Sequence, residues 1–187
     1  KELYGVESKI IYNFISDKNI APKMVKFITL SRATKEKGID LIVKLCEMFK
    51  EQGKIFIWFL CSTLEQLEDE ELLNKIRNIP EIVLIPPSIN NKDLISSCDY
   101  VVQLSKSDSY CYSLREGLKR GVPILTTNFA EAHNFLKEGK NGYMLKMDLS
   151  NVNIDKIFNE IPTEAKYVNE CNSKDWINIF EKGEIDV

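Results

Sequence analysis

Short apolar runs alternate with longer stretches of helical period along most of this chain. Strands are expected near residues 26–30, 55–60, 82–85, 100–104, 123–126 and 143–145. Helices are expected near residues 38–52, 64–78, 91–97, 112–120, 130–138, 151–160 and 173–182. Strands that alternate with helices pair in parallel through right-handed crossovers. The pattern therefore predicts an α/β fold of three layers with a parallel sheet of about six strands.

Size and composition agree with a folded globular domain. The chain has 187 residues, enough for one domain with a core that is stable alone, and 44% of them are hydrophobic and 28% charged. A net charge of −3 argues against a nucleic-acid binder, for which a basic face is expected. We find no signal peptide and no transmembrane run, so we expect a cytoplasmic protein.

The cysteines and the single histidine point to neither disulfides nor a metal. The cysteines are scattered without a Cys-x-x-Cys pair, at positions 46, 61, 98, 111 and 171, and we expect reduced thiols. His133 has no cluster of His, Cys or acidic residues near it in the sequence, so we expect no metal site.

A basic loop follows the first predicted strand. Residues 26–30 read Lys-Phe-Ile-Thr-Leu, and Ser31, Arg32, Lys37 and Gly38 follow before a helix begins. This order puts cations at the carboxyl edge of a parallel sheet, where open α/β folds bind ligands. An arginine fork and a lysine point charge together complement a diphosphate. Taken alone, such a basic loop is more often a solvated turn.

Two carboxylates flank the start of a later predicted helix. Asp108 and Glu116 are separated by seven residues, and the helix ends at a Gly-Val-Pro turn, residues 121–123. One acid can lie on the loop and the other in the first turns of the helix, so both can reach the hydroxyls of a polyol. The unpaired N–H groups between them can face a phosphate. The alternative is an N-terminal cap from Asp108 or Ser109 and a solvated glutamate.

Together, the basic loop and the acid pair resemble the retaining glycosyltransferases of family 4, which have the two-domain GT-B architecture. The family loop carries Arg and Lys five residues apart and then Gly, as Arg32, Lys37 and Gly38 do. The resemblance covers roughly residues 4–147 and begins with the linker that enters the second domain. Residues 173–180 are similar to the family's closing helix, which bears a tryptophan.

This resemblance implies the C-terminal half of a GT-B enzyme, a Rossmann-like domain that binds a nucleotide sugar. Arg32 and Lys37 would bind the diphosphate, Asp108 the transferred sugar and Glu116 the ribose hydroxyls. These four would be the catalytic residues. The other donor-binding residues would be Ser31, Gly38, Pro86, Ser109, Tyr110, Cys111, Tyr112 and Ser113. Such enzymes generally need no metal, and the chain has no Asp-x-Asp motif, so we predict no cofactor beside the UDP- or GDP-sugar substrate.

Several positions depart from the family pattern. The first acid is Asp108 where the family has Glu, and Asn134 stands where Glu is usual. Residues 61–63, Cys-Ser-Thr, replace a glycine-rich turn, and residues 86–87, Pro-Pro, replace a glycine in the loop that faces the base. Residues 109–111 read Ser-Tyr-Cys in place of Gly-aromatic-Gly, which makes close approach of the backbone to the donor harder.

We expect a nucleotide-sugar-binding domain over residues 1–165 and a helical segment over residues 166–187, without the N-terminal acceptor domain. Lys1 begins the chain without Met, so we expect an excised half of a longer enzyme, inactive without its missing domain or a partner chain. The expected reaction moves a hexose from a UDP- or GDP-sugar to a glycan, lipid-linked or protein acceptor. We expect it to serve bacterial surface polysaccharide synthesis, at the inner face of the membrane through the missing domain.

Three other functions remain open. A GT-B nucleotide-sugar epimerase shares the fold and nucleotide site but needs a catalytic His, and His133 lies outside any such motif. A regulatory module of flavodoxin-like fold needs an acidic cluster after the first strand, where this chain has Arg32. A non-catalytic, glycosyltransferase-like partner subunit is compatible with the substitutions at residues 109–111 and 134.

Overall fold

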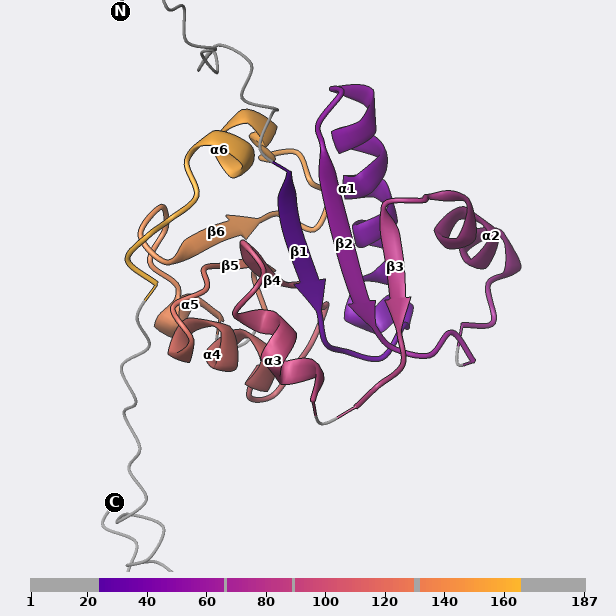
Figure 1. The fold of residues 1–187 in the computed structure, drawn as a ribbon, viewed down its shortest axis with the longest axis horizontal. Coiled ribbons are helices and arrows are strands. Elements are labelled where there is room, and N and C mark those ends of the chain that lie inside the picture. The colour runs from indigo at the N-terminus through magenta and orange to yellow at the C-terminus, as the bar shows by residue number, and fades with distance from the viewer. Residues whose placement is uncertain (1–23, 66, 89, 130–131, 166–187) are drawn as a thin grey trace, which may run out of the picture.

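The computed structural model describes residues 24–65, 67–88, 90–129 and 132–165. Within these ranges one parallel sheet of six strands has the order β3-β2-β1-β4-β5-β6 (Figure 1). Its strands are β1 (Val25–Thr29), β2 (Phe56–Cys61), β3 (Ile82–Ile85), β4 (Tyr100–Gln103), β5 (Ile124–Thr127) and β6 (Gly142–Leu145). The predicted α/β Rossmann-like fold is confirmed. The predicted linker at residues 4–15 and the predicted helix at 173–182 lie outside the described residues.

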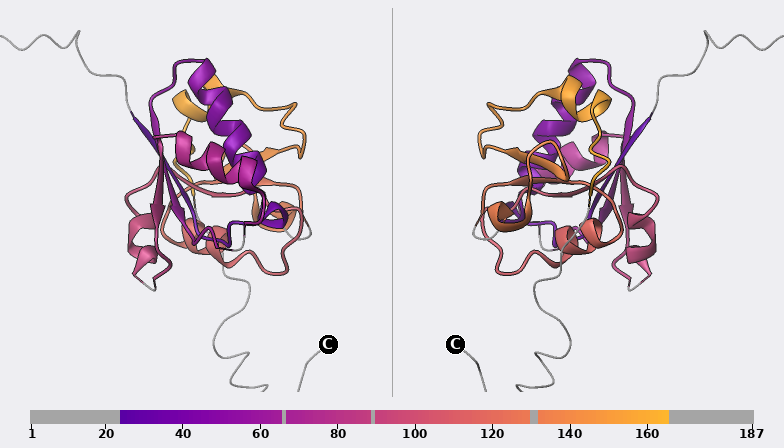
Figure 2. Two further views of the ribbon diagram at one scale, coloured as in Figure 1. Left: turned by 90° about the vertical axis from the view of Figure 1, so that its right-hand side faces the viewer. Right: turned by 90° about the vertical axis from the view of Figure 1, so that its left-hand side faces the viewer.

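Helices cover both faces of the sheet, which makes three layers (Figure 2). The helices are α1 (Ile39–Glu51), α2 (Glu70–Asn78), α3 (Asn91–Ile95), α4 (Tyr112–Lys119), α5 (Ala132–Phe135) and α6 (Ile154–Asn159), with a 3-10 turn, η2 (Lys35–Lys37). Buried residues of α1, α2 and α6 pack in one hydrophobic cluster. Buried residues of α3, α4 and α5 pack in a second cluster on the other face.

The first cluster is built around aromatic rings of the central strands. Phe27 of β1 is fully buried and stacks on Trp58 and Tyr100, with ring centroids 5.0 and 5.6 Å away. The polar ends of these neighbours are satisfied, because the Trp58 indole donates to the Thr29 hydroxyl at 3.0 Å and the Tyr100 hydroxyl to the Ile157 carbonyl at 3.0 Å. Buried aromatics with paired polar atoms fix the register of adjacent strands.

The strand order reverses direction between β1 and β4. From β1 the chain proceeds outward to β2 and β3, whereas from β4 it proceeds the other way to β5 and β6. The loops that leave the carboxyl ends of β1 and β4 therefore diverge, and open α/β sheets bind ligands at such a switch point.

Gly38 brings these two loops into close contact. It is buried with a φ of +75°, and a Cβ on it would lie 1.9 Å from the carbonyl oxygen of Leu104, which follows β4. Only glycine allows both this conformation and this approach. The packing explains Gly38 without a direct ligand contact.

Several helices are shorter than predicted, and the largest difference lies at the start of α2. The helix expected at residues 64–78 begins only at Glu70, because Asp69 caps it by accepting a hydrogen bond from the Leu72 N–H at 2.9 Å. The acidic residues before Asp69 are therefore outside the helix. None of the described helices is long and apolar enough to span a membrane.

Candidate functional site

The loops after β1 and β4 are joined by an ion pair between two predicted site residues. The Lys37 Nζ lies 2.8 Å from Asp108 Oδ2, and the two side chains are only 15% and 20% exposed. Glu36 adds two bonds, since its carbonyl accepts from the Lys106 N–H and its carboxylate from the Ser107 hydroxyl, each at 2.9 Å. The structure thus brings together a predicted phosphate ligand and a predicted sugar ligand.

The Asp108 carboxylate is fully engaged before any ligand binds. Its Oδ2 accepts from Lys37 and from the Gln103 amide at 2.7 Å, and its Oδ1 accepts from the N–H groups of Tyr110 at 3.3 Å and Cys111 at 3.1 Å. Partial burial acts to raise the pKa of Asp108, but Lys37, the Cys111 N–H and Gln103 outweigh it. The pKa therefore lies below the ordinary carboxyl value, and Asp108 is ionised at neutral pH.

The proposed cap from Asp108 or Ser109 is wrong. The residue that precedes α4 is Cys111, in a left-handed conformation with φ 57° and ψ 47°, and no side chain caps the helix. Asp108 binds the N–H of Cys111 itself, one step ahead of the helix. The Cys111 side chain is buried in the second cluster, so it faces the core. A positive φ at this position is a physical reason for a glycine there, and Cys111 accepts the strain instead.

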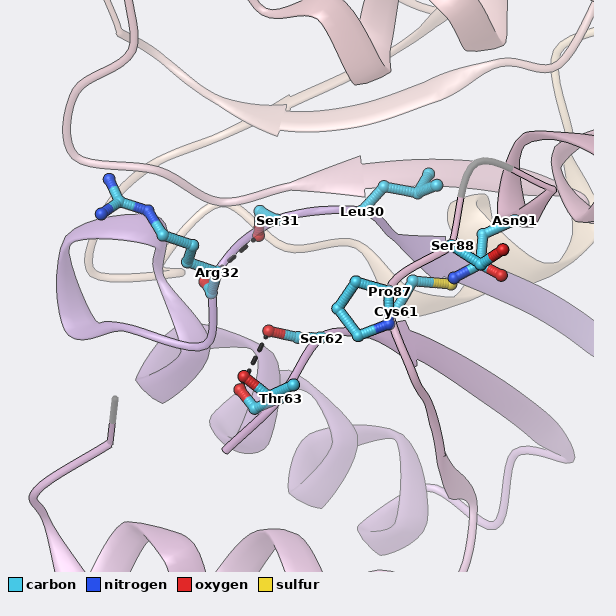
Figure 3. A pocket seen from close by; sticks show the side chains of 9 residues that line it. All are labelled: Leu30, Ser31, Arg32, Cys61, Ser62, Thr63, Pro87, Ser88 and Asn91. Carbon is cyan, nitrogen blue, oxygen red and sulfur yellow. Dashed lines mark hydrogen bonds between the residues drawn. The ribbon is translucent and has the colours of Figure 1, made fainter. Parts of the chain in front are cut away.

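A pocket of about 300 Å³ opens at the carboxyl ends of β1, β2 and β3, the edge of the sheet that also carries the ion pair. Its lining residues are Leu30, Ser31, Arg32, Cys61, Ser62, Thr63, Pro87, Ser88 and Asn91 (Figure 3). Pro87 lines it, whereas the predicted Pro86 offers its carbonyl to the Asn91 amide at 2.7 Å. The pocket is mainly apolar, with hydroxyl and amide groups at its edge.

Arg32 occupies the rim of this pocket. Its guanidinium extends outward, away from Pro87 and Asn91 (Figure 3). Arg32 is exposed, and it forms no ion pair with any other residue in the described part of the chain. An unpaired fork of donors beside an apolar pocket can bind an anionic group that projects from a ligand seated there.

The remaining predicted residues lie around the start of α4. Glu116 of α4 pairs with Arg120, the residue directly after this helix, with Oε1 and Nη1 3.2 Å apart. The rings of Tyr110 and Tyr112 lie 4.6 Å apart at their centroids, and Tyr112 is 76% exposed. Ser109 is exposed as well, whereas the Ser113 hydroxyl donates to Gln103 at 2.7 Å. Ser109, Tyr110 and Tyr112 are therefore the accessible side chains of this group.

Gln103 is one of the site residues that the sequence reasoning missed. It ends β4, is 3% exposed, and contacts both Asp108 and Ser113. A signal was present, because Gln103 is the only polar side chain in the apolar run Val101-Val-Gln-Leu104. An amide at the carboxyl end of a buried strand needs partners, and the polar loop that follows supplies them.

The described residues have dispersed potential metal ligands and buried cysteines. They contain no group of three or more His, Cys, Asp or Glu side chains that could hold a metal ion. Cys46, Cys61 and Cys98 are free thiols and are buried, Cys111 is buried as well, and Cys171 lies outside the described residues. Burial raises the pKa of Cys98 to about 11, so this thiol is protonated at neutral pH.

Similar folds occur in solved glycosyltransferases. HepE from Anabaena in complex with UDP-glucose matches with a TM-score of 0.63 and 18% identity, over 76% of this chain and 42% of HepE. The lipopolysaccharide outer core galactosyltransferase WaaB matches with a TM-score of 0.58 and 13% identity, over 82% of this chain and 43% of WaaB. The pneumococcal O-GlcNAc transferase GtfA, in complex with UDP and GlcNAc, matches with a TM-score of 0.52 and 20% identity, over 84% of this chain and 29% of GtfA.

These matches cover less than half of each structure, so the chain spans about two fifths of the length of HepE. No curated protein matches the sequence. The family model for glycosyl transferases group 1 matches residues 12–171, most of the 187 residues. This chain therefore belongs to the glycosyl transferases of group 1.

Proposed function

We propose that this chain is the donor-binding, C-terminal half of a retaining glycosyltransferase of family 4. One observation carries the proposal. At the switch point between β1 and β4, Arg32, which forms no ion pair within the described residues, borders an apolar pocket at the same sheet edge that carries the Lys37–Asp108 ion pair. A nucleotide sugar has the matching parts in the matching order, with a flat base, an anionic diphosphate and a polyhydroxyl sugar.

In the proposed binding mode the base enters the pocket and rests against Pro87. The diphosphate then lies outside the rim, where Arg32 extends and Lys37 is close to the loop after β4. Glu116 binds the ribose hydroxyls, and the transferred sugar lies near Asp108. Ser31, Ser109, Tyr110 and Tyr112 complete the surface that the donor contacts.

The chemical demand on this half is to stabilise the departing nucleotide diphosphate. Positive charge that is fixed in place before the reaction does this without a reorganisation cost, and exclusion of water strengthens it. Arg32 and Lys37 supply that charge in the proposal, so transfer needs no metal. A second domain would cover the crevice and bind the acceptor, and residues 1–165 without it would bind the donor but turn over no sugar.

The relatives favour particular substrates within this class. HepE was crystallised with UDP-glucose and GtfA with UDP and GlcNAc, so we propose UDP ahead of GDP and a hexose as the transferred group. WaaB acts on lipopolysaccharide outer core, which favours a surface glycan or a lipid-linked saccharide as acceptor. We propose that the reaction takes place at the cytoplasmic face of the membrane, which the chain would reach through the second domain.

A non-catalytic partner subunit is the second candidate. The observation in its favour is that every oxygen of Asp108 is already engaged, and that Cys111 replaces a glycine of the family's acidic motif. Such a chain would keep the fold without binding a donor.

Calorimetric titration separates these functions. The chain is titrated with UDP, GDP, ADP and CMP, without metal and then with Mg²⁺. We expect binding of one nucleoside diphosphate, UDP first, at the same affinity with and without Mg²⁺. Binding that requires Mg²⁺ would contradict the metal-independent mode. Absence of binding to all four nucleotides would favour the partner subunit or a site completed only by the second domain.

A further inference from the structure

Gln103 is the last residue of the central strand β4, and the loop that follows it forms part of the candidate site. The side chain is 3% exposed and makes three hydrogen bonds. Its Nε2 donates to Asp108 Oδ2 at 2.7 Å and to the Ser105 hydroxyl at 3.1 Å, and its Oε1 accepts from the Ser113 hydroxyl at 2.7 Å. The amide thus connects the end of a strand, the loop after it and helix α4.

The chemistry of these partners permits one orientation of the amide. An ionised carboxylate only accepts hydrogen bonds, so the NH₂ group must face Asp108. The Gln103 oxygen then faces Ser113, whose hydroxyl donates to it. The backbone is held as well, because the Gln103 carbonyl accepts from the Thr126 hydroxyl of β5 at 2.9 Å. Gln103 is consequently a fixed donor on a rigid strand.

The same carboxylate oxygen receives Lys37. Asp108 Oδ2 accepts both the Gln103 amide at 2.7 Å and the Lys37 ammonium at 2.8 Å. Lys37 ends a short 3-10 turn, and a flexible lysine there has many rotamers to lose. A carboxylate that Gln103 anchors from the strand therefore holds the Lys37 ammonium in one place, on the same loop after β1 that carries Arg32.

We propose that Gln103 is a positioning residue of the donor site, which holds the Asp108 carboxylate and, through it, the Lys37 cation that receives the donor diphosphate. This role rests on the proposed function, but its geometry can be tested without a nucleotide. Gln103 touches no substrate in this scheme and acts only through Asp108.

Few charged groups surround the anchored carboxylate. Lys37 on η2 contacts it directly, and Glu36 of the same turn bonds the neighbouring Ser107. Arg115 of α4 lies over the Tyr110 ring, with its Cζ 4.3 Å from the centroid. Lys106 is turned toward Asp40, 3.9 Å away. A change at Gln103 is therefore read through Lys37 and Asp108 first.

The first test replaces the amide by an apolar side chain of similar length. In Gln103→Met, Asp108 loses one donor, so its pKa should rise relative to the unmodified chain, as measured by carboxyl ¹³C shifts in an NMR titration. The amides of Tyr110 and Cys111 should exchange faster because the carboxylate that holds them becomes mobile. UDP affinity should fall at least about fivefold, the loss that one hydrogen bond to a charged group can cause.

Thr29→Val is the matched control. The Thr29 hydroxyl is buried as Gln103 is and also donates a hydrogen bond, but to the Val102 carbonyl of β4 at 3.0 Å and not to Asp108. We expect it to lower stability without moving the titration of Asp108. If Gln103→Met does not fold, Ser113→Ala removes the hydroxyl that orients the amide and should shift the Asp108 titration in the same direction, by less.

The second test determines whether protonation of a carboxyl group at position 103 restores UDP binding. Gln103→Glu puts a second carboxyl group beside Asp108, and two carboxyl groups in contact share one proton and titrate as a pair with a raised pKa. At about pH 5.5 the shared proton replaces the amide donor, whereas at about pH 8 both groups are ionised and repel each other. The measured quantity is the affinity of Gln103→Glu for UDP divided by the affinity of the unmodified chain at the same pH. This ratio should be near one at about pH 5.5 and at least about tenfold lower at about pH 8. The ratio cancels the ionisation of the UDP phosphate itself.

The outcomes separate this proposal from the proposed function. If Asp108 titrates identically in the unmodified chain and in folded Gln103→Met, Gln103 does not hold the carboxylate and the inference is wrong. It is also wrong if the affinity ratio of Gln103→Glu is the same at both pH values. If the unmodified chain binds no nucleotide, it is either a partner subunit or a half whose donor site needs the second domain, while the carboxyl titration still decides the role of Gln103.

Discussion

The two halves of the candidate site differ in how far they are satisfied without a ligand. In the pocket half, which consists of Ser31, Arg32, Cys61, Ser62 and Pro87, the arginine is exposed and forms no ion pair within the described ranges. In the network half, which consists of Lys37, Gln103, Asp108 and Ser113, each polar side chain already bonds another member. The halves lie side by side at one edge of one sheet.

This difference assigns them different tasks. A satisfied polar network is rigid and specifies geometry, but it gains little when a ligand arrives, because each new bond replaces an old one. An unpaired guanidinium gains a full charge-assisted bond with an anion. The pocket half should therefore supply most of the affinity, and the network half should supply the position and discrimination of the groups that are bound.

Disrupting the close contact between the loops after β1 and β4 should have the largest effect on stability. Gly38→Ala would force a Cβ to within 1.9 Å of the Leu104 carbonyl at a φ of +75°. We expect a loss of about 3 kcal/mol in the free energy of unfolding, from overpacking and backbone strain together. Gly53→Ala is the control, since Gly53 has a φ of +63° but nothing within 4 Å, and it should cost only about 1–2 kcal/mol. Urea denaturation measures both, and equal losses would show that the contact with β4 is relaxed easily.

Removing the unpaired cation tests the pocket half directly. Arg32→Ala should weaken UDP binding by more than about tenfold, through loss of roughly 1.5–3 kcal/mol of charge-assisted bonding. Lys35→Ala serves as the control on the same loop, because Lys35 already pairs with Asp69 at 2.6 Å. Calorimetry should find its affinity nearly unchanged. Similar losses in both variants would mean that only the overall charge of the loop matters.

A substitution at Glu116 tests which part of the ligand lies near α4, beyond the two halves. Glu116→Ala should weaken UDP about fivefold, from loss of hydrogen bonds to the ribose, and leave inorganic diphosphate nearly unaffected. Glu71→Ala is the matched variant, because Glu71 also pairs with a cation four residues later, Lys75, at 3.1 Å. An unchanged affinity of folded Glu116→Ala for UDP would remove the ribose from the vicinity of α4.

The smallest expected effect concerns the network half. It is the loss of folding stability as the pH is lowered. Lys37, the Cys111 N–H and Gln103 outweigh burial and depress the pKa of Asp108, so its bonds stabilise the fold above the unfolded-state pKa and are lost as the pH falls through the folded-state value. Thermal unfolding followed below about pH 4 should show a shallower decline for Asp108→Asn than for the unmodified chain. A parallel decline in the two would mean that the ion pair contributes nothing measurable.

The fold could be predicted from the sequence because each strand is a short apolar run between polar turns. The six predicted strands fall within two residues of the observed ones, since burial on both faces demands continuous apolar sequence. Helix starts were less predictable. Asp69 begins a helix within a run of acidic residues, and the identity of the cap depends on backbone angles that composition does not reveal.

The site was predicted as a set of positions but not as a set of bonds. Arg32, Lys37 and Asp108 lie at the expected sheet edge because parallel strands bring their carboxyl ends together. The ion pair between Lys37 and Asp108 depends on how two loops fold against each other, and their separation of 71 residues in sequence leaves no local signal. The left-handed conformation of Cys111 was not predicted from the cysteine itself, and the family's glycine at this position was its only signal.

The strand order also has a consequence for synthesis of the chain on the ribosome. β1 ends at Thr29, and its second neighbour, β4, begins at Tyr100. At roughly 5–20 residues per second, about 4–14 s pass before β4 can be translated, and during that time one edge of the most central apolar strand has no partner. An open apolar edge favours association with other nascent chains. Slow translation between β3 and β4 should therefore reduce the yield of folded protein more than an equal delay after β4, when both central strands are already paired.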